Sequence, residues 1–541
     1  MLFRSVKKIL RGYERELTAR FIAFRSHWQY QAEFCTPGEG HEKGGVEGEV
    51  GYFRRNHWVP VPVARDLAEL NVKLLADCRQ DENRILSGRS ANVGTLLLAE
   101  KEHLRPLPAE DFELAEVSFP HVNQAGCAKV RTNFYSVPLR SGSVVEARVY
   151  SSVVEFRQDG VQVAQHQRSY ERAQQVLDLE HYLEVLERKP GALRGSKPLA
   201  QWRVRAASTP LGEYVNGRFY RGILTGLNEA FVIDGATRKH LIVEHPSSED
   251  VIKPFLRGRD VKRWRIEPQD QWLIFVPWHF PLQEDSSIVG ASLKAEREFR
   301  KRYPAIYAYL HGFKAELSAR NKSETGVHYE WYALQRWGAE FWREFAQPKI
   351  VVPAIAERPQ FAADWKGFYS NNKTTIFVPP SVEFALAVAN SSVACWVAQQ
   401  TFATKQGGFF DFEPRYSSTI PVPTLTPAQV QLVECLVRII LVLNQAPTDA
   451  QASHQTAYFE QLVNGLMYEA FFADELHAQS IFLFKFVEQA KLPDLHAIPK
   501  TRRLGVAQEA FEQIYDLNHP IRSCLFSLRA LEIVRIIEGD E

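Results

Sequence analysis

The periodicity of apolar residues changes several times along this chain, and these changes constrain the fold more than any single motif. Apolar residues recur at helical spacing over residues 64–99, alternate with polar residues over 130–167, and return to helical spacing after residue 424. A period of two is typical of half-buried strands, whereas a spacing of three or four is typical of amphipathic helices. Because one hydrophobic core rarely grows beyond about 250–300 residues, the 541 residues are expected to form several domains.

The N-terminal part predicts helices joined by a glycine-rich loop. Apolar residues at helical spacing on a basic segment predict one helix from Met1 to about Arg25, broken near Ser26. Residues 35–51 are rich in glycine and carboxylates, and they predict a loop that runs into a helix stopped by Pro60. The sequence PLPAEDF at 106–112 marks a linker.

Residues 130–167 predict a small β-barrel of short strands. Asp159-Gly160 separates the last two strand-like segments, as a two-residue hairpin turn does. Residues 171–191 return to helical spacing, and the stretch 192–212, rich in basic and small residues, is the candidate junction with the second half of the chain.

The second half predicts a mixed α/β domain followed by helices. Helices are expected over 291–320 and 382–403, and helical spacing continues after 427, with a break at 492–499. Strands are expected around residues 218–226, 230–234, 271–277, 348–355 and 373–379.

The bulk composition limits the possible partners. Lys and Arg number 65 against 64 Asp and Glu, so any attraction for a polyanion must come from local patches. Neither a signal peptide nor a run of about 18 apolar residues is evident, which predicts a cytoplasmic protein without a membrane partner. The six cysteines are far apart and form no CxxC pair, so neither structural zinc nor a disulfide framework is expected.

A glycine-rich acidic motif, HEKGGVEG at 41–48, carries the first resemblance. Its residue types alone favour a polar turn that enters a helix. The longer run FRSHWQYQAEFCTPGEGHEKGGVEGEVGYFRRNHWVPVP, at 24–62, resembles IstA-type insertion-sequence transposases at the end of their retroviral-integrase-like catalytic core. The resemblance continues through 122–139 and 176–202, which are similar to the small β-barrel and following helices of that family. It implies that Glu47 is the third acid of the family's acidic triad.

The transposase chemistry is expected to be incomplete. Two-metal strand transfer needs several carboxylates around two ions about 4 Å apart, and no aspartate is present among the 46 residues before Glu47. The family's N-terminal helix-turn-helix is also missing, so Glu47 is expected to be a relic without catalytic activity. A basic set could contact a DNA backbone weakly or form a solvated face: Lys7, Lys8, Arg11, Arg54 and Arg55.

A basic strip, KPFLRGRDVKRWR, lies between Lys253 and Arg265. It holds six basic residues against one acid, with Phe255 and Trp264 between them, a composition that can follow phosphates while an aromatic ring stacks. Solvated charge on the surface of a helix is the alternative interpretation.

Two polar segments could lie near a bound partner. The two glycines in YRGILTGLN, at 220–228, suit either the close approach of backbone to a partner or an ordinary hairpin. Residues 369–374, YSNNKT, offer amides and hydroxyls that could read base edges or form a polar turn.

The segments 220–234, 252–264, 349–355 and 370–380, followed by helices, together resemble the TaqI-like C-terminal specificity domain of type IIG restriction enzymes, which are fused endonuclease and adenine-specific DNA methyltransferase chains. The resemblance covers about residues 205–541 and implies a mixed α/β target-recognition domain with accompanying helices that binds double-stranded DNA. We expect phosphate contacts from Lys253, Arg257, Arg259, Lys262 and Arg263, and base contacts from Asn371, Asn372 and Lys373.

The catalytic motifs of that family are not found in the 541 residues. There is no Asn-Pro-Pro sequence and no glycine-rich turn in a suitable setting for S-adenosylmethionine. No cofactor or metal is therefore expected in this chain, and S-adenosylmethionine and Mg²⁺ would serve only if a partner supplied the missing domains. Three hypotheses stay open: a DNA-binding specificity module, a subunit acting with a separate adenine methyltransferase, and a non-functional fusion relic of transposon insertion.

The expected architecture is multidomain α and β. It comprises a truncated integrase-core end with helices (1–105), a small β-barrel with a following helix (106–202), a mixed α/β target-recognition domain (203–424) and a C-terminal helical bundle (425–541).

Overall fold

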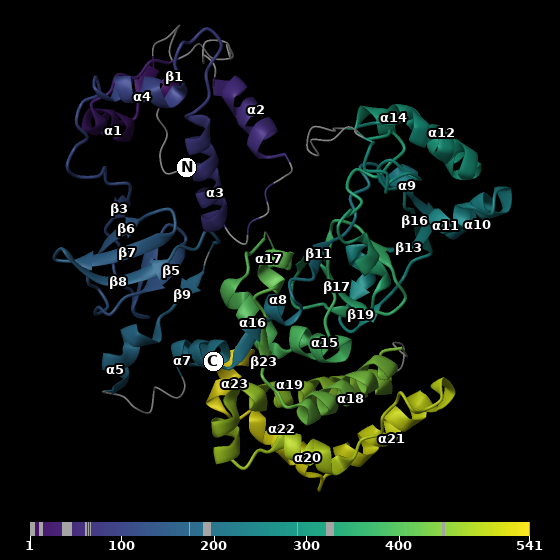
Figure 1. Cartoon of the computed structure of the whole chain (residues 1–541). Helices are drawn as coiled ribbons and strands as arrows, with labels where there is room; N and C mark the ends of the chain where they lie inside the picture. The colour runs from purple at the N-terminus through teal and green to yellow at the C-terminus, as the bar shows by residue number, and fades with distance from the viewer. Residues whose placement is uncertain are drawn as a thin grey trace. The chain divides into compact units, whose positions relative to one another are not determined.

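Figure 1 shows the computed structural model of the chain, a multidomain protein of mixed α/β fold with a helical C-terminal region. The structure describes residues 6–9, 15–34, 46–59, 62, 64, 67–172, 174–187, 196–288, 290–320, 329–405, 407–445 and 450–539. Two compact units are present, one of Met1–Ser118 with Glu146–Arg157 and one of Phe119–Val145 with Gln158–Glu541. The domain boundaries expected after residues 105, 202 and 424 stay predictions.

The N-terminal segment begins with strands, so the single helix expected up to Arg25 is wrong over its first half. Strands β1 (Val6–Ile9) and β2 (Arg15–Leu17) pair antiparallel, and Lys7 Nζ donates to Glu16 Oε1 at 2.7 Å across them. Helical spacing was misleading here because the same short basic segment can pair as a hairpin. The helices that follow are α1 (Ala19–Trp28), α2 (Val46–His57), α3 (Leu67–Asp81) and α4 (Val93–Lys101). Helix α2 ends before Pro60, as predicted.

The strands expected over 130–167 are confirmed. Strands β3 (Glu116–Ser118), β6 (Glu146–Val149) and β7 (Val153–Gln158) form antiparallel pairs in the order β3-β6-β7. Strands β4 (Cys127–Val130) and β5 (Asn133–Ser136) pair antiparallel, and β9 (Gln175–Val176) pairs with β5 in parallel. Asp159 (φ 52°) and Gly160 (φ 80°) connect β7 to β8 (Val161–Gln167) with the positive φ angles of a type I′ turn.

The candidate junction at 192–212 contains a packed helix, α7 (Lys197–Ala206). Ser196 caps this helix by accepting a hydrogen bond from Leu199 N. Ala200 and Val204 are buried in the hydrophobic core that the C-terminal helices also build. The helical segment before it is shorter than expected, and consists of η2 (Leu179–Tyr182) and α5 (Leu183–Glu187).

Two four-stranded sheets form the centre of the second half, and the strands expected there are confirmed. The first has the order β11-β21-β17-β19, with β11 at Phe219–Arg221, β21 at Thr374–Phe377, β17 at Lys349–Pro353 and β19 at Ala362–Asp364. The second has the order β12-β16-β13-β20, with β12 at Val232–Asp234, β16 at Gln271–Ile274, β13 at Ile252–Leu256 and β20 at Tyr369–Ser370. Only the β13–β20 pair is parallel among these neighbours.

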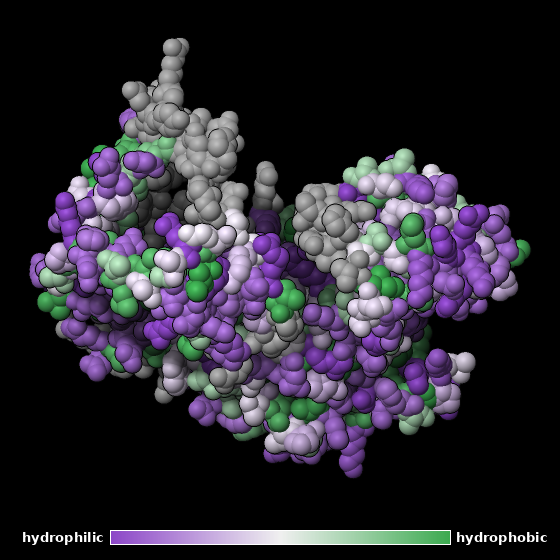
Figure 2. Space-filling model, turned by 45° about the horizontal axis from the view of Figure 1, so that its top comes forward, coloured by the Kyte–Doolittle hydropathy of each residue, from purple (hydrophilic) through white to green (hydrophobic). Residues whose placement is uncertain are grey.

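Helices gather beside β13 and β16 (Figure 1). They are α10 (Gly235–Glu244), α12 (Leu293–Arg302), α13 (Pro304–His311) and α14 (Lys314–Ala319). Helix α12 buries Ala295 and Phe299 and exposes charged residues. Figure 2 accordingly shows a mainly hydrophilic surface over this lobe, on the right of the view.

The predicted helical tail is confirmed. It follows α15 (Val382–Asn390) and α16 (Ser392–Thr401) and contains α18 (Pro427–Leu443), α19 (Ala450–Ala478), α20 (Leu483–Ala490), α21 (Arg503–Tyr515), α22 (Pro520–Leu528) and α23 (Glu532–Glu538). Within the described residues, no single helix is long and apolar enough to cross a membrane, although α15 and α16, bent by 57°, together pass that test. Both of these helices contribute residues to the core shared with α18–α23.

A buried ion pair joins the neighbouring strands β17 and β19. Lys349 is fully buried, and its Nζ donates to Asp364 Oδ2 and to Phe345 O, each at 2.5 Å. Asp364 also accepts from the backbone N–H groups of Lys366 and Phe368 at 2.7 and 2.8 Å. Burial lowers the pKa of Lys349, whereas the carboxylate of Asp364 opposes that shift.

We predict that Asp364→Asn lowers stability by about 3–5 kcal/mol, because it leaves the Lys349 ammonium buried without a counter-charge. The double variant Lys349→Met, Asp364→Asn should recover much of that loss, since it removes the buried unpaired ammonium and keeps an acceptor oxygen for one of the two N–H groups. Thermal and urea unfolding of both variants test this. A double variant as unstable as the single one would contradict this role of the ion pair.

Candidate nucleic-acid interface

The basic strip is not a helix. It runs along strand β13, through the short 3₁₀ turn η3 (Gly258–Asp260), and into a small hairpin of β14 (Val261–Lys262) and β15 (Arg265–Ile266). Asp260 is buried and accepts a hydrogen bond from Arg257 N at 2.7 Å. The carboxylate of Asp260 therefore holds the backbone of η3 in place. It does not neutralise most of the basic side chains of the strip.

The segment 370–374 is a tight polar turn between β20 and β21. Thr374 N donates to Asn371 O at 3.0 Å, and Lys373 N donates to Asn371 Oδ1 at 3.3 Å. Asn372 and Lys373 are exposed at the tip of this turn, whereas Asn371 is half-buried. Part of the hydrogen-bonding capacity of Asn371 is thus used inside the turn.

The structure brings the basic strip and this turn together, although more than a hundred residues separate them in sequence. Leu256 on β13 pairs with Ser370 on β20, and Asn371 N donates to Leu256 O at 3.3 Å. A Cβ atom on Gly258 would lie 3.1 Å from Lys373 O. We call the surface formed by residues 257–262 and 371–373 the basic turn surface.

The glycines of 220–228 suggested that backbone comes close to another group there. In the structure that group is the backbone of residues 370–372 of the same chain. Ile223 N donates to Ser370 O at 2.7 Å, and Asn372 N donates to Ile223 O at 3.0 Å. A Cβ atom on Gly222 would lie 2.0 Å from Asn371 O. Gly222 therefore positions the turn that carries Asn371–Lys373, and the interpretation of this glycine as a contact with a partner is replaced.

Replacement of Gly222 by alanine should displace the 370–374 turn, because no real Cβ atom tolerates a 2.0 Å contact with backbone. We expect a loss of stability of about 1–3 kcal/mol, the usual range for overpacking, measured by thermal unfolding.

The matched control is Gly505→Ala in helix α21, where nothing lies within 4 Å of the added Cβ. It should stabilise by about 0.5–1 kcal/mol through helix propensity. If the two variants changed the free energy of unfolding by the same amount and in the same direction, the role assigned to Gly222 would be contradicted.

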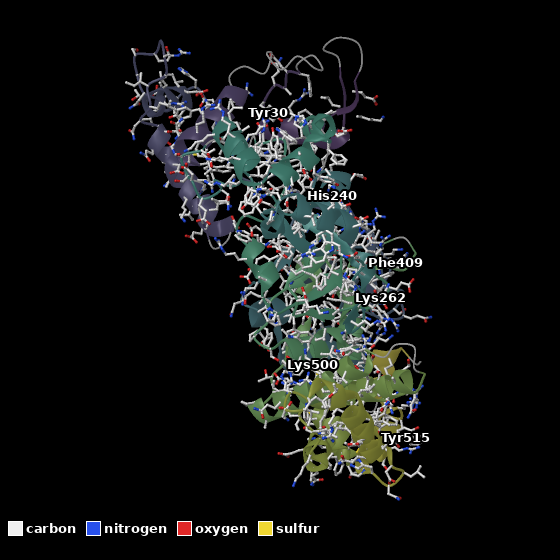
Figure 3. The ribbon with its side chains drawn as sticks, turned by 90° about the vertical axis from the view of Figure 1, so that its right-hand side faces the viewer. Tyr30, His240, Lys262, Phe409, Lys500 and Tyr515 are labelled. Atoms are coloured by element: carbon white, nitrogen blue, oxygen red, sulfur yellow. The ribbon has the colours of Figure 1, made fainter. Side chains whose placement is uncertain are left out.

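The candidate DNA-binding side chains differ in exposure. Arg259 and Lys262 are exposed, and Lys253 and Arg257 are half-buried. Arg259 Nε lies 3.8 Å from Asp260 Oδ1 and its side chain is 68% exposed, so this surface pair leaves the guanidinium accessible. Figure 3 shows Lys262 toward one edge of the molecule, with Phe409 near the same edge.

Arg263 differs from the other candidates because its guanidinium has internal partners. Its Nη2 lies 2.9 Å from Glu460 Oε2 on helix α19, and its Nη1 donates to Pro359 O at 3.4 Å. It also lies over the ring of Trp264, 5.4 Å from the centroid. A phosphate contact from Arg263 stays a prediction, and these contacts show that it also joins the hairpin to the C-terminal helices.

In the transposase-like part, Glu47 lies near the start of α2, and its side chain is outside what the structure describes, as is Arg11. Lys7 pairs with Glu16, Lys8 lies on β1, and Arg54 and Arg55 are exposed in the last turn of α2. Within the described ranges, no group of three or more His, Cys, Asp or Glu side chains could hold a metal ion.

Sequence reasoning missed a second group of basic residues. Arg265, Lys366, Lys500 and Arg503 line one cavity together with Trp264 and Trp365. Lys366 and Lys500 are 134 residues apart, so no local pattern could have joined them.

Comparison with known proteins identifies two kinds of region in this chain. Residues 253–422 match the TaqI-like C-terminal specificity domain, and residues 107–178 match the C-terminal domain of Mu transposase. The first match contains the basic turn surface, and the second contains β3–β9. The chain therefore carries a transposase-like N-terminal region and a TaqI-like specificity domain.

Individual proteins similar to this chain include transposases and restriction-modification proteins. A transposase from Aminobacter aminovorans is 32% identical over 204 residues, which cover 36% of this chain and 40% of the relative. The type II methyltransferase M.MjaIV from Methanocaldococcus jannaschii is 22% identical over 228 residues, which cover 41% of this chain and 69% of the relative. The solved structure of the type IIL restriction-modification enzyme MmeI in complex with DNA aligns over 55% of this chain and 36% of that chain, with 12% identity and a TM-score of 0.33. The chain spans well under half the length of the transposase that it matches.

Proposed function

We propose that the second half of the chain is the target-recognition module of a type IIG-like restriction-modification system and binds double-stranded DNA through the basic turn surface. The match of residues 253–422 to the TaqI-like specificity domain is the observation that carries this proposal. The transposase-like region would add at most weak contacts to the DNA backbone.

The geometry supports two kinds of DNA contact on this surface, one with phosphates and one with base edges. Arg259 and Lys262 are exposed cations suited to phosphate oxygens, and the exposed Lys373, which the sequence placed among the base contacts, suits a phosphate equally well. Asn372 presents an exposed amide at the tip of the turn. Amides can pair with adenine in the major groove, and basic side chains contribute affinity that depends on salt. The backbone bonds between Leu256 and Asn371 hold both kinds of group in one place.

No catalytic step is assigned to this chain. Methyl transfer would need a domain that binds S-adenosylmethionine, and strand cleavage would need a cluster of Mg²⁺ ligands, which is not found among the described residues. A separate adenine-specific methyltransferase could provide the first. The chain's own residues would place that domain at its site on the DNA.

A second candidate is a fusion product without a selected function. It is favoured by the occurrence of a transposase-like region and a specificity domain in one chain. Both candidates allow the second half to fold, and binding of DNA with a sequence preference distinguishes them.

The full chain should bind a 30-base-pair duplex of mixed sequence with an affinity that falls as salt is raised, measured by fluorescence anisotropy. Arg259→Ala, Lys262→Ala and Lys373→Ala should each weaken binding and reduce the slope of log affinity against log salt by about 0.9 for each phosphate that is no longer neutralised. Asn372→Ala should instead relax sequence preference when a randomised duplex pool is retained on the protein and sequenced.

The matched control is Lys239→Ala, an exposed lysine on α10 outside the basic turn surface. It should leave both affinity and salt slope unchanged. Binding that does not depend on salt, or variants of the surface that behave like the control, would overturn the proposal.

A further inference from the structure

A cavity of about 670 Å³ lies between the β15 and β19 region and helices α18 and α21. It is lined on one side by residues from within 264–268 and 363–368, without Glu267 and Gly367, and on the other by residues from within 441–445 and 500–504. Its volume falls within the range of about 300–1,000 Å³ that is typical of sites for small ligands, and it is too small for a DNA duplex.

The charge of this cavity is strongly positive. Arg265, Lys366, Lys500 and Arg503 line it, and Asp364 is the acid among its lining residues. Asp364 is already neutralised by Lys349, and Arg265 pairs with Glu267. The ammonium groups of the exposed Lys366 and Lys500 form no ion pair within the described residues, so the cavity offers unbalanced cations.

Aromatic side chains form the remainder of the wall. Trp365 is 50% exposed, an unusual state for a large apolar ring, and Phe368 is half-buried beside it. An exposed indole close to lysine and arginine is the arrangement on which nucleobases stack. A planar aromatic ligand therefore fits this wall better than an aliphatic one.

Trp264 also lines the cavity, and its backbone conformation is unusual. It is 3% exposed, and its Nε1 donor is buried without a hydrogen-bond partner in the part of the chain that the structure describes. Its backbone adopts φ 68°, a strained conformation for a residue with a bulky side chain. An unsatisfied buried donor and a strained backbone both cost free energy in the folded chain.

The start of helix α21 adds to the positive wall. This helix begins at Arg503, directly after the short turn η5 (Lys500–Arg502), and no side chain caps it. Its first turn contains no acidic residue. The Arg503 N–H is already used by Lys500 O, so the side chains of Lys500 and Arg503, without an acid in this turn, make the wall favourable to anions.

From these observations we infer that the cavity is a binding site for a nucleoside phosphate. The base stacks on Trp365, and the phosphate pairs with Lys366, Lys500 and Arg503. The ligand is either a free nucleotide or one nucleotide of a single strand, because the same chemistry serves both. Figure 3 shows Lys500 beside the yellow C-terminal helices, below the level of Lys262.

The site does not depend on duplex binding by the basic turn surface. A mononucleotide can occupy it in a protein that ignores duplex DNA, and a protein that binds duplex normally can lack it. Titrations with the two kinds of ligand therefore succeed or fail independently.

Isothermal titration calorimetry of the full chain tests the inference with deoxyadenosine monophosphate, deoxyadenosine, inorganic phosphate and a six-nucleotide single strand. We expect one saturable site for the monophosphate or for the strand, and binding of the nucleoside or of phosphate alone that is at least roughly tenfold weaker, because each retains only half of the contacts. Binding of the monophosphate indicates a free nucleotide as ligand, whereas binding of the strand alone indicates a nucleotide within a chain.

Variants that change the charge or remove an aromatic ring of the cavity wall test whether the ligand binds there. The double variant Lys366→Glu, Lys500→Glu and the single variant Trp365→Ala should each weaken binding by roughly tenfold or more. Arg502→Glu, an exposed neighbour that does not line the cavity, is the control for charge, and Trp202→Ala, 56% exposed on α7, is the control for loss of an indole. Both controls should bind like the unaltered chain, and circular dichroism verifies that all variants fold.

Three results would overturn the inference. The first is the absence of saturable binding for both the monophosphate and the strand. The second is binding of phosphate alone as tightly as of the monophosphate. The third is binding that the cavity variants reduce no more than their controls.

Discussion

The backbone contact between strand β13 and the turn after β20 is the constraint on which the rest of this surface depends. Leu256 O accepts from Asn371 N, and the Gly222–Ile223 backbone closes against the same turn from the other side. Backbone hydrogen bonds therefore fix the relative positions of three segments that are remote in sequence. Side-chain contacts alone would position them less closely. The cations of residues 257–262 and the amide of Asn372 share one surface because of this contact, and the buried Lys349–Asp364 pair joins two strands of the sheet beside it.

Much of the fold could be predicted from the sequence, because the residue pattern determines local structure. Strands such as β17 and β21 and the helices after residue 427 follow from the periodicity of apolar residues, and the hairpin at Asp159-Gly160 follows from its turn residues. The first strands were missed because Val6 and Ile9 have the spacing of a helix, although the segment pairs as a hairpin. The basic strip could not be assigned to strand and hairpin, since its charges obscure any period.

The candidate site could be predicted only as separate segments. Its residue types were evident, but the contact of Gly222 with Asn371, and of Arg263 with Glu460, joins residues that are about 150 to 200 positions apart. No spacing rule reaches over such separations, which is why the sequence left both a partner contact and an ordinary hairpin open for the glycines of 220–228. The cavity around Trp264 was missed for the same reason, since its two walls come from opposite ends of the second half. The resemblance to known families supplied the general function, and the structure supplied the relations between side chains.

The central claim is that residues 257–262 and 371–373 form one surface that contacts duplex DNA. Hydrogen–deuterium exchange of the full chain, with and without a saturating duplex, tests it most directly because it reports on each segment separately. We expect slower exchange in peptides that cover 253–262 and 369–376 when duplex is added, with no change in α10. Protection confined to other parts of the chain, or protection of only one of the two segments, would contradict it.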